Sequence, residues 1–318
     1  MIVDLDDATL AESRVFNEQL TALLREQPSV HLLPPEVSRL ARREGRSVFP
    51  QPVFLPQARD VPVPTRGGQI RVRVLPPEGE ITGVYLHIHG GGWVLGDCDE
   101  HDVRLTALAE ATGLCAVSIG YRLAPEHPYP AGPDDCEDAA LWLLESGLSE
   151  LGLPSRLAIG GESAGAHLSV TTLLRLRDRH GITGAFRAAN LVFGVFDLSM
   201  TPSQRNWGDQ YLVLSTPIMH WFGRSFAGDR SVDELRDPDI SPLYAELHDL
   251  PPALFSVGDT DPLLDDSLFM SARWRAAGND AELRVWPESI HGFTLFPLEL
   301  ARRANEEQYD FLRRAVAD

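Results

Sequence analysis

The sequence lacks any apolar run that approaches the roughly 20 residues a helix needs to cross a bilayer. Its opening residues, 1–7, are acidic and contain neither a basic leader nor the apolar core of a signal peptide. Both absences argue against a secreted or membrane-spanning protein. We therefore expect no stable membrane insertion and a cytoplasmic location.

The sequence also has few cysteines and no internal repeat. The cysteines are Cys98, Cys115 and Cys136; three cannot all pair, and none is spaced as Cys-x-x-Cys. Cys115 lies in an apolar run, where a free cysteine acts as a small core residue. The sequence contains no internal repeat, low-complexity tract or block of like charge. These absences argue against a disulfide scaffold and against a Cys-x-x-Cys site.

Positive charge is the third deficit. The chain has 28 Lys and Arg residues against 46 Asp and Glu residues, which gives a formal net charge of -18 at pH 7. Nucleic acids and anionic membrane surfaces bind proteins through basic patches. We therefore expect no nucleic-acid partner, and we interpret the acidity as a contribution to solubility.

The composition that is present suits one large domain. The chain has 318 residues, of which 43% are hydrophobic, enough to bury a sizeable core. Short apolar runs that predict strands alternate with longer patterns that predict helices. Such alternation indicates an α/β fold with a mostly parallel sheet covered by helices on both faces. The expected strands lie at 70–74, 83–88, 114–119, 157–159, 191–196, 253–257 and 282–286, and the expected helices at 8–26, 102–111, 134–144, 164–180, 265–277 and from 299.

Two segments depart from this alternation. Prolines within residues 50–64 predict an irregular stretch, and residues 198–245 follow neither period. The aromatic residues of the second segment could form a wall for an acyl group or a small core of their own. Elsewhere, Asp134 or Asp135 is placed to cap the helix expected there. The aromatic residues are Trp207, Tyr211, Trp221, Phe222 and Phe226.

The stretch from 157 to 168 combines a buried strand, paired glycines, one serine and the start of a helix. Within it, Gly161-Glu162-Ser163-Ala164-Gly165 matches Gly-x-Ser-x-Gly, the strained strand-to-helix turn that exposes a serine hydroxyl above a sheet. Glycine is needed on both sides because a Cβ would collide with the neighbouring strand or helix. The helix that follows directs its free N–H groups at the same point. We predict that Ser163 is a nucleophile.

A serine hydroxyl becomes nucleophilic only when a base removes its proton and a third group orients that base. In such a fold the partners follow in the order serine, acid, histidine, each just past the end of a strand. Asp261 and His291 follow the last two expected strands in that order. We assign His291 as the general base and Asp261 as its acid. Asp259, Asp265 and Asp266 are close enough in sequence to be alternatives for the acid.

The oxyanion that forms on the attacked carbonyl requires fixed N–H donors. Ala164, directly after the serine, supplies one of them. We assign the others to Gly91 and Gly92, because only glycine lets the backbone approach a ligand that closely. Gly90 is expected to shape the turn, and His89 to brace the glycine loop by hydrogen bonds.

Two further histidines require interpretation. His87 and His89 alternate on an expected strand and could suggest a metal pair, but no carboxylate or third histidine has matching spacing. We therefore expect no metal site. His167 lies one helical turn after Ser163, where a side chain points along the helix, so we interpret it as structural.

Five motifs, in the same order over most of the chain, are His89-Gly-Gly-Gly-Trp93, Tyr121-Arg-Leu-Ala-Pro-Glu126-His-Pro-Tyr-Pro130, Gly161-Glu-Ser-Ala-Gly165, Asp261-Pro-Leu-Leu-Asp-Asp266 and His291-Gly-Phe293. Together they are similar to those of the hormone-sensitive-lipase-type esterases of the α/β-hydrolase superfamily. The resemblance implies a carboxylic-ester hydrolase that needs no cofactor, and it favours Asp261 over Asp259 as the acid. Many members have Asp where this chain has Glu162.

The same resemblance implies a domain organisation. Residues 1–318 would form a single α/β-hydrolase domain with an eight-stranded sheet, and about 1–50 and 198–245 would form a cap. Family members set substrate choice in this cap. Neither cap region matches a specific pattern in this chain, so the sequence leaves the substrate open.

We predict a serine carboxylesterase that hydrolyses short- to medium-chain esters through an acyl-enzyme intermediate. The aromatic segment favours an enclosed pocket over a lipid-facing surface. An enclosed pocket suits an acyl chain of short to medium length. An amide, formamide or N-acetyl hydrolase with the same triad is the enzymatic alternative. A non-catalytic small-molecule receptor is the alternative from another class, because plant gibberellin receptors resemble these esterases but have lost the catalytic histidine. The expected partner is a small-molecule ester, and we allow for a homodimer.

Overall fold

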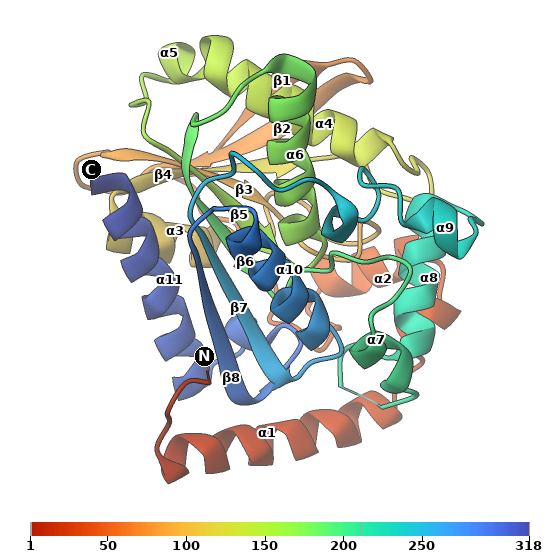
Figure 1. Ribbon diagram of the computed structural model, residues 1–318. Helices are drawn as coiled ribbons and strands as arrows, with labels where there is room; N and C mark the ends of the chain where they lie inside the picture. Colours follow the sequence, from red (N-terminus) through yellow and green to blue (C-terminus); the bar gives the residue numbers. More distant parts are fainter. Residues whose placement is uncertain (1, 211, 318) are drawn as a thin grey trace.

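In the computed structural model, which describes residues 2–210 and 212–317, eight strands form one sheet (Figure 1). Tyr211, one of the aromatic residues noted above, lies outside the described residues. The strand order across the sheet is β1-β2-β4-β3-β5-β6-β7-β8. The strands are β1 (Arg59–Thr65), β2 (Gly68–Leu75), β3 (Gly83–Ile88), β4 (Leu114–Gly120), β5 (Leu157–Glu162), β6 (Phe186–Val192), β7 (Ala253–Thr260) and β8 (Ala281–Ile290).

The sheet is mostly parallel, as the sequence pattern predicted. Neighbouring strands from β4 through β3, β5, β6 and β7 to β8 all run parallel. β2 is antiparallel to both of its neighbours, β1 and β4. The carboxyl ends of the parallel strands therefore meet at one edge of the sheet, where open α/β sheets place their binding sites.

Helices cover both faces of the sheet, which confirms the predicted layering. Ile159 of β5 packs in a core cluster with α4, α6 and α10, whereas its neighbour Ala158 packs in a second cluster with α3 and α11. Successive strand residues point to opposite faces, so the two clusters lie on opposite sides of the sheet. The helices are α1 (Asp7–Arg25), α2 (Pro35–Arg43), α3 (Asp102–Thr112), α4 (Ala131–Trp142), α5 (Leu148–Leu151), α6 (Ala164–His180), α7 (Pro202–Asn206), α8 (Thr216–Ala227), α9 (Val232–Leu235), α10 (Leu264–Ala276) and α11 (Glu299–Ala317).

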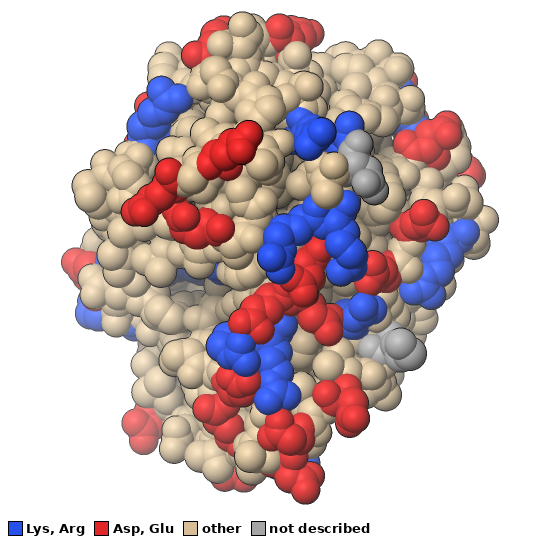
Figure 2. Space-filling view, turned by 90° about the vertical axis from the view of Figure 1, so that its left-hand side faces the viewer, with Lys and Arg blue, Asp and Glu red and all other residues tan. Residues whose placement is uncertain are grey.

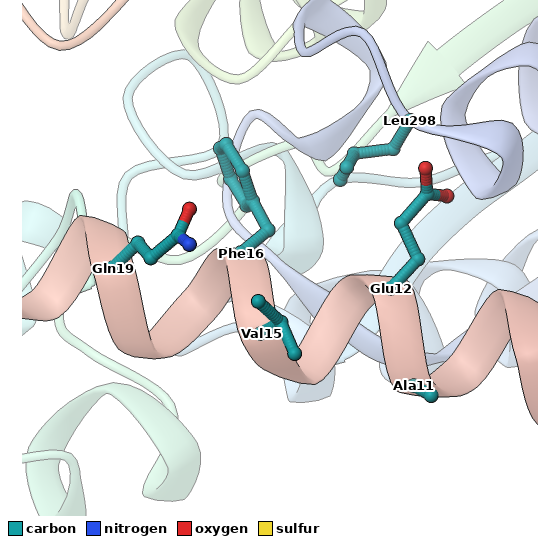
Figure 3. A pocket seen from close by; sticks show the side chains of 6 residues that line it. All are labelled: Ala11, Glu12, Val15, Phe16, Gln19 and Leu298. Atoms are coloured by element: carbon teal, nitrogen blue, oxygen red, sulfur yellow. The ribbon is translucent and has the colours of Figure 1, made fainter.

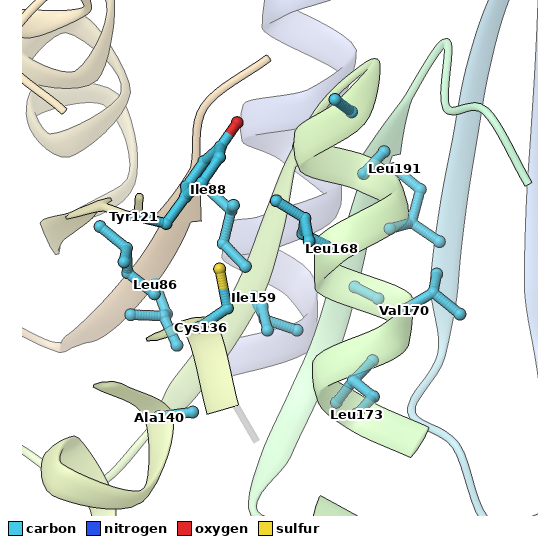
Figure 4. Close-up of a cluster of buried hydrophobic side chains, with 14 of the residues drawn as sticks. Leu86, Ile88, Tyr121, Cys136, Ala140, Ile159, Leu168, Val170, Leu173 and Leu191 are labelled. Carbon is cyan, nitrogen blue, oxygen red and sulfur yellow. The ribbon is translucent and has the colours of Figure 1, made fainter. Parts of the chain in front are cut away.

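The larger cluster fixes α6 against the sheet. Figure 4 shows Ile88 and Ile159 on the strands and Leu168 on α6 within this cluster, with Cys136 of α4 beside them. All of these side chains are fully buried. Because α6 begins directly after Ser163, this packing sets the position from which the serine projects. Cys136, like Cys98 and Cys115, is a free and buried thiol.

The proline-rich stretch is more regular than the sequence predicted. β1 contains Pro62 and Pro64 yet pairs with β2 along its full length. Proline lacks the N–H that a central strand donates, but an edge strand such as β1 can tolerate it. Pro35 likewise occupies the first turn of α2, where its missing N–H is not needed. The prediction of irregular structure here was therefore wrong for residues 59–65, and the short helix α2 was missed.

The predicted cap of the helix near residue 134 was also wrong. α4 begins earlier, after Pro130, and no side chain caps it. The Asp135 carboxylate is buried and instead accepts hydrogen bonds from the Arg122 backbone N–H at 2.9 Å and from its guanidinium Nε at 2.8 Å. Asp135 therefore pairs with Arg122 and does not cap the helix.

Strand boundaries differ most at β6 and β8. The expected strand at 191–196 ends at Val192, because β6 spans Phe186–Val192. β8 spans Ala281–Ile290 and is longer than the expected 282–286. The extension of β8 brings its carboxyl end directly to His291.

The N-terminal segment reaches the far edge of the sheet. The Val3 N–H donates to the Val285 carbonyl of β8 at 2.9 Å, and Arg14 of α1 forms a 2.8 Å ion pair with Glu288. Figure 1 shows α1 lying below β8, beside the start of α11. A shallow groove runs along this helix (Figure 3), and its lining residues are Ala11, Glu12, Val15, Phe16, Gln19 and Leu298.

Charged side chains of both signs mix on the surface. Figure 2 shows basic and acidic groups side by side in a stripe on one face. All 28 basic residues are arginines, and α11 pairs several of them with its own carboxylates, as in Arg302 with Glu306 and Arg303 with Glu299. In the part of the chain that the structure describes, no helix is long and apolar enough to cross a membrane.

Candidate active site

Ser163 occupies the sharp turn between β5 and α6. Its backbone has φ +56° and ψ −120°, a conformation that side-chain-bearing residues rarely adopt. Glycines allow the turn to pack: a Cβ on Gly161 would lie 2.0 Å from the Ile88 carbonyl oxygen, and one on Gly165 would lie 1.9 Å from the same atom. The Ser163 N–H donates to the Val192 carbonyl at 2.9 Å, which ties the turn to β6.

The structure brings His291 and Asp261 to this serine. His291 follows β8 and Asp261 follows β7, so both lie at the carboxyl edge of the sheet. His291 Nε2 is 3.0 Å from Ser163 Oγ, and His291 Nδ1 is 2.9 Å from Asp261 Oδ2. The other Asp261 oxygen accepts the Leu263 N–H at 2.8 Å.

The hydrogen bonds define which imidazole nitrogen carries the proton. The Asp261 carboxylate, 1% exposed, accepts the Nδ1–H of His291. Nε2 is then free to accept the hydroxyl proton of Ser163. The Phe193 ring lies edge-on to the imidazole, with centroids 4.8 Å apart, and shields it from solvent. This is the arrangement that activates a serine nucleophile.

The three alternative carboxylates are engaged elsewhere. Asp259 is exposed and accepts a bond from the neighbouring Thr260 hydroxyl. Asp265 accepts the Ser203 N–H at 2.8 Å. Asp266 is buried and accepts the Phe196 and Asp197 N–H groups and the side chains of Thr201 and Gln204. Of the four candidates, Asp261 is the one in contact with His291.

The glycine loop after β3 presents free N–H donors beside the serine. Gly91 and Gly92 have φ values of +112° and +60°. A Cβ on Gly91 would lie 2.1 Å from the Leu95 carbonyl oxygen, so only glycine fits. Within residues 2–210 and 212–317, the N–H groups of Gly91, Gly92 and Ala164 have no acceptor. They are therefore free to donate to a bound group, and their role toward an oxyanion stays a prediction.

Other bonds hold the shape of this loop. The His89 ring Nδ1 lies 2.8 Å from the Gly90 carbonyl, and the Tyr121 hydroxyl donates to the His89 carbonyl at 3.0 Å. The Leu95 N–H donates to the Gly91 carbonyl at 2.8 Å. His89 thus braces the loop, as predicted. Burial lowers the pKa of His89 to about 4, so the ring is neutral and donates from Nδ1.

His87 and His167 belong to the supporting structure. His87 Nδ1 lies 2.9 Å from the Ser118 hydroxyl on the neighbouring strand. His167 accepts the Trp93 indole N–H at 3.2 Å and bonds the Ile240 carbonyl at 2.9 Å. His167 therefore links α6 to the segment after α9. Among the described residues, no group of three or more His, Cys, Asp or Glu side chains could hold a metal ion.

A cavity of about 550 Å³ lies over Ser163 and His291. Residues within 24–49, 209–210 and 212–222 form most of its lining, and the glycine loop forms the remaining side. The apolar side chains of its lining include Leu24, Val30, Leu33, Leu214, Ile218 and Phe222. The α1 groove, in contrast, has one ionisable side chain, Glu12, which accepts the Glu299 N–H. It does not contain a set of residues for catalysis.

Sequence analysis missed several residues of this site. Phe193, Arg104 and His101 belong to no recognisable motif, and only the fold brings them near the serine. Residues 24–33 fall within the cap of about 1–50 that the resemblance implied, but their own sequence indicated only a helix end and a proline break. Their place in the cavity had no sequence signal, because the lining depends on how the N-terminal segment crosses the sheet edge.

Comparison with known proteins places the chain among hydrolases. A family described as alpha/beta hydrolase fold matches residues 85–295. The carboxylic ester hydrolase LipN of Mycobacterium tuberculosis is 36% identical over 82% of this chain and 71% of its own length. The ethyl acetate hydrolase of Pseudomonas putida is 34% identical over 74% of each chain. The solved hyperthermophilic esterase of Pyrobaculum calidifontis is 30% identical, covers 95% of this chain and 98% of its own, and superimposes with a TM-score of 0.84.

Proposed function

This chain belongs to the hormone-sensitive-lipase-type esterases of the α/β-hydrolase superfamily, and on that basis we propose a catalytic role for each residue of its site. The protein is a carboxylic-ester hydrolase of the serine type. Ser163 is the nucleophile, His291 the general base and Asp261 the acid that orients the base. The observation that carries this assignment is the unbroken hydrogen-bond chain from Ser163 Oγ to Asp261 Oδ2.

Acylation follows from the geometry. His291 Nε2 takes the proton of Ser163 Oγ as this oxygen forms a bond to the ester carbonyl carbon. The carbonyl oxygen becomes an oxyanion, and the N–H groups of Gly91, Gly92 and Ala164 stabilise it. His291 then gives the proton to the leaving alcohol oxygen as the ester C–O bond breaks. The Asp261 carboxylate stabilises the imidazolium throughout.

Deacylation repeats these roles with water. His291 Nε2 removes a proton from a water molecule, whose oxygen attacks the acyl carbon. The bond to Ser163 Oγ breaks, and His291 returns the proton to the serine. The carboxylic acid leaves and the hydrogen-bond chain is restored.

The substrate is a short- to medium-chain ester. The cavity of about 550 Å³ is lined by residues from the two segments that we propose as the cap, about 1–50 and 198–245. Within the first segment, residues 24–49 line the cavity, whereas α1 packs on β8. The ethyl acetate hydrolase among the relatives supports a small acyl group. We assign substrate choice to the cap residues that line this cavity.

Replacement of the nucleophile tests the assignment. Ser163→Ala is expected to lower kcat by roughly a millionfold, the scale found when a triad loses its nucleophile. An organophosphonate ester should label the wild-type serine once per chain and leave the variant unlabelled, as intact mass measurements would show. Ser169→Ala is the matched control, because Ser169 lies on α6 and bonds only the Gly165 carbonyl. Turnover near the wild-type rate in Ser163→Ala would refute the assignment.

The alternative functions are not favoured. The relatives reported above are named as ester hydrolases, which favours esters over amides. A receptor would not need His291 Nε2 within 3.0 Å of Ser163 Oγ. Ester and amide substrates with the same acyl group, assayed side by side, would distinguish an esterase from an amide hydrolase. The homodimer and the cytoplasmic location stay predictions, which sedimentation velocity and cell fractionation would test.

A further inference from the structure

Glu162, the residue directly before the nucleophile, has a buried side chain that the mechanism above does not use. It is 3% exposed and lies between the end of β5 and the glycine loop. A Cβ on Gly90 would lie 2.7 Å from the Glu162 carbonyl oxygen and 3.3 Å from its Cγ. The glycine loop therefore rests directly on this residue.

The two carboxylate oxygens of Glu162 have different partners. Oε1 accepts the Gly90 N–H at 3.4 Å. Oε2 accepts a guanidinium N–H of Arg104, from α3, at 2.7 Å. His87 Nε2 lies 3.2 Å from the same carboxylate oxygen and 3.0 Å from the same Arg104 nitrogen, and His101 Nε2 lies 3.5 Å from Oε1. Glu162 thus connects the glycine loop to α3, which packs on the face of the sheet opposite α6.

The cluster around Glu162 pairs one negative group with one positive group. Burial is the largest single influence and opposes ionisation of this carboxyl, but the Arg104 guanidinium and the nearby His87 and His101 rings together outweigh it and hold the pKa of Glu162 well below its usual range. Burial also lowers the pKa of His87 and of His101, so both imidazoles are neutral. A lone carboxylate behind the loop would repel an oxyanion. Arg104 cancels that charge while Glu162 keeps both of its acceptor oxygens.

Glu162 holds the N–H side of the peptide plane between His89 and Gly90, and the Tyr121 hydroxyl holds its carbonyl side. The carbonyls of His89, Gly90 and Gly91 all have partners within the scaffold. The Gly90 N–H has Glu162 as its acceptor. The next two N–H groups along the chain, those of Gly91 and Gly92, are the ones left free. The direction in which they point depends on the preceding peptide plane, which Glu162 and Tyr121 anchor from its two sides.

We propose that Glu162, held by Arg104, is a positioning residue that fixes Gly90 and so aims the Gly91 and Gly92 N–H groups at the oxyanion. The proposal rests on the function proposed above, because it assigns Glu162 to the stabilisation of that oxyanion. It predicts an effect on the transition state that exceeds the effect on substrate binding.

Glu162→Gln tests this role with little change of shape. An amide has one oxygen, and both the Arg104 guanidinium and the Gly90 N–H require an acceptor. The charged group takes the oxygen, so the amide NH₂ faces the Gly90 N–H and displaces it. We expect kcat for p-nitrophenyl butyrate to fall by roughly tenfold or more, less than the loss of an oxyanion donor itself. KM should stay within about threefold of its wild-type value, because the affected N–H groups stabilise the oxyanion of the transition state and contribute little to binding of the substrate.

A trifluoromethyl ketone gives a second readout, because its adduct with serine carries an oxyanion. Its inhibition constant should rise in parallel with the fall in kcat. Glu162→Asp retains two acceptor oxygens on a shorter side chain, so its loss should be smaller than that of Glu162→Gln. Asp135→Asn is the matched control: it removes a buried carboxylate from its pair with Arg122, away from the glycine loop, and should leave kcat unchanged.

The outcomes separate this proposal from the function on which it rests. Wild-type protein that neither hydrolyses the ester nor takes the phosphonate label would refute the proposed function. Labelled and active wild-type protein, with Glu162→Gln folded and its kcat within about threefold, would overturn the role of Glu162 alone. A change confined to KM would also overturn it. If Glu162→Gln does not fold, Glu162→Asp decides: a folded variant with unchanged kcat and inhibition constant overturns the proposal.

Discussion

Ser163, the proposed nucleophile, has a backbone conformation that its own side chain disfavours. A non-glycine residue at φ +56° costs about 1–3 kcal/mol, and surrounding structure must hold it there. Two close glycine contacts with β3 and one backbone bond to β6 supply that restraint. The conformation is what places Oγ within 3.0 Å of His291 Nε2. The proposed catalysis therefore depends on the contacts with β3 and β6 that hold the Ser163 backbone in this conformation.

Asp261 is expected to act through the imidazole proton. Asp261→Asn would present an amide to His291 Nδ1 and favour the tautomer in which Nε2 carries the proton and cannot accept one from Ser163. We expect kcat to fall about 10,000-fold, as for the corresponding change in other serine triads. Steady-state assays of purified, folded variant would measure it.

Asp259→Asn is the control for this change. Asp259 is two residues earlier, is exposed, and bonds only its neighbour Thr260. Its replacement should alter kcat by no more than about twofold, since such surface changes have small effects. A large loss in Asp259→Asn together with an active Asp261→Asn would reverse the assignment of the acid.

At the scale of elements, α8 packs on the glycine loop. A Cβ on Gly92 would lie 2.2 Å from the Phe222 ring, so the ring lies directly over the loop. One turn later, Phe226 stacks on Trp93 with centroids 4.5 Å apart. The helix therefore contributes to the cavity wall and supports the loop at once. Phe222 and Phe226 both belong to the large core cluster, and Phe222 also lines the cavity, so the aromatic segment does not form a separate core of its own with these two rings.

Phe222 is expected to limit acyl-chain length. Phe222→Ala would enlarge the cavity beside the glycine loop, so kcat/KM should fall for acetyl esters and rise for longer acyl esters. The variant should also be destabilised by about 3–5 kcal/mol, the usual cost of removing a buried phenyl ring. A series of p-nitrophenyl esters, assayed below the unfolding transition, would show the change. Phe269→Ala, on the exposed side of α10, is the control; an unchanged series in Phe222→Ala would contradict the prediction.

The elements that the sequence predicted are those whose pattern is local. The strand, serine and helix around Ser163 follow one another within a few residues, so period and glycine placement were sufficient. Asp261 and His291 could be found because each follows a strand. In contrast, β1 forms because β2 lies beside it, which no pattern within residues 59–65 reveals. Arg104 reaches Glu162 only through the packing of α3 beneath the sheet, so its role had no local signal.

The whole molecule buries several histidines in the neutral form. Burial lowers the pKa of His89 and of His167 to about 4, and it also lowers the pKa of His87 and of His101. In the unfolded chain these rings take up protons near pH 6.5. Between pH 6.5 and about 4 the unfolded state therefore binds more protons than the folded state. The free energy of unfolding is expected to decrease as the pH falls through this range.

His167 offers a direct measurement of this effect. Its shift corresponds to roughly 3 kcal/mol of stability lost by pH 4, since one pKa unit is about 1.4 kcal/mol. His167→Asn keeps an acceptor for the Trp93 N–H and removes the titrating ring, so its stability should depend less steeply on pH. Urea denaturation at a series of pH values would measure both slopes. His248→Asn, at an exposed site, should keep the wild-type slope; equal slopes in all three proteins would contradict the prediction.

The contact between residue 3 and β8 sets an order for assembly during translation. The segment before β1 is synthesised before β8 and α11, which form the surface on which α1 rests. Until those elements are made, the apolar face of α1 has no partner and the cavity lacks one wall. The α1 helix can therefore dock only after β8 and α11 have been synthesised, and the binding cavity is completed at the stage at which His291 reaches the sheet edge.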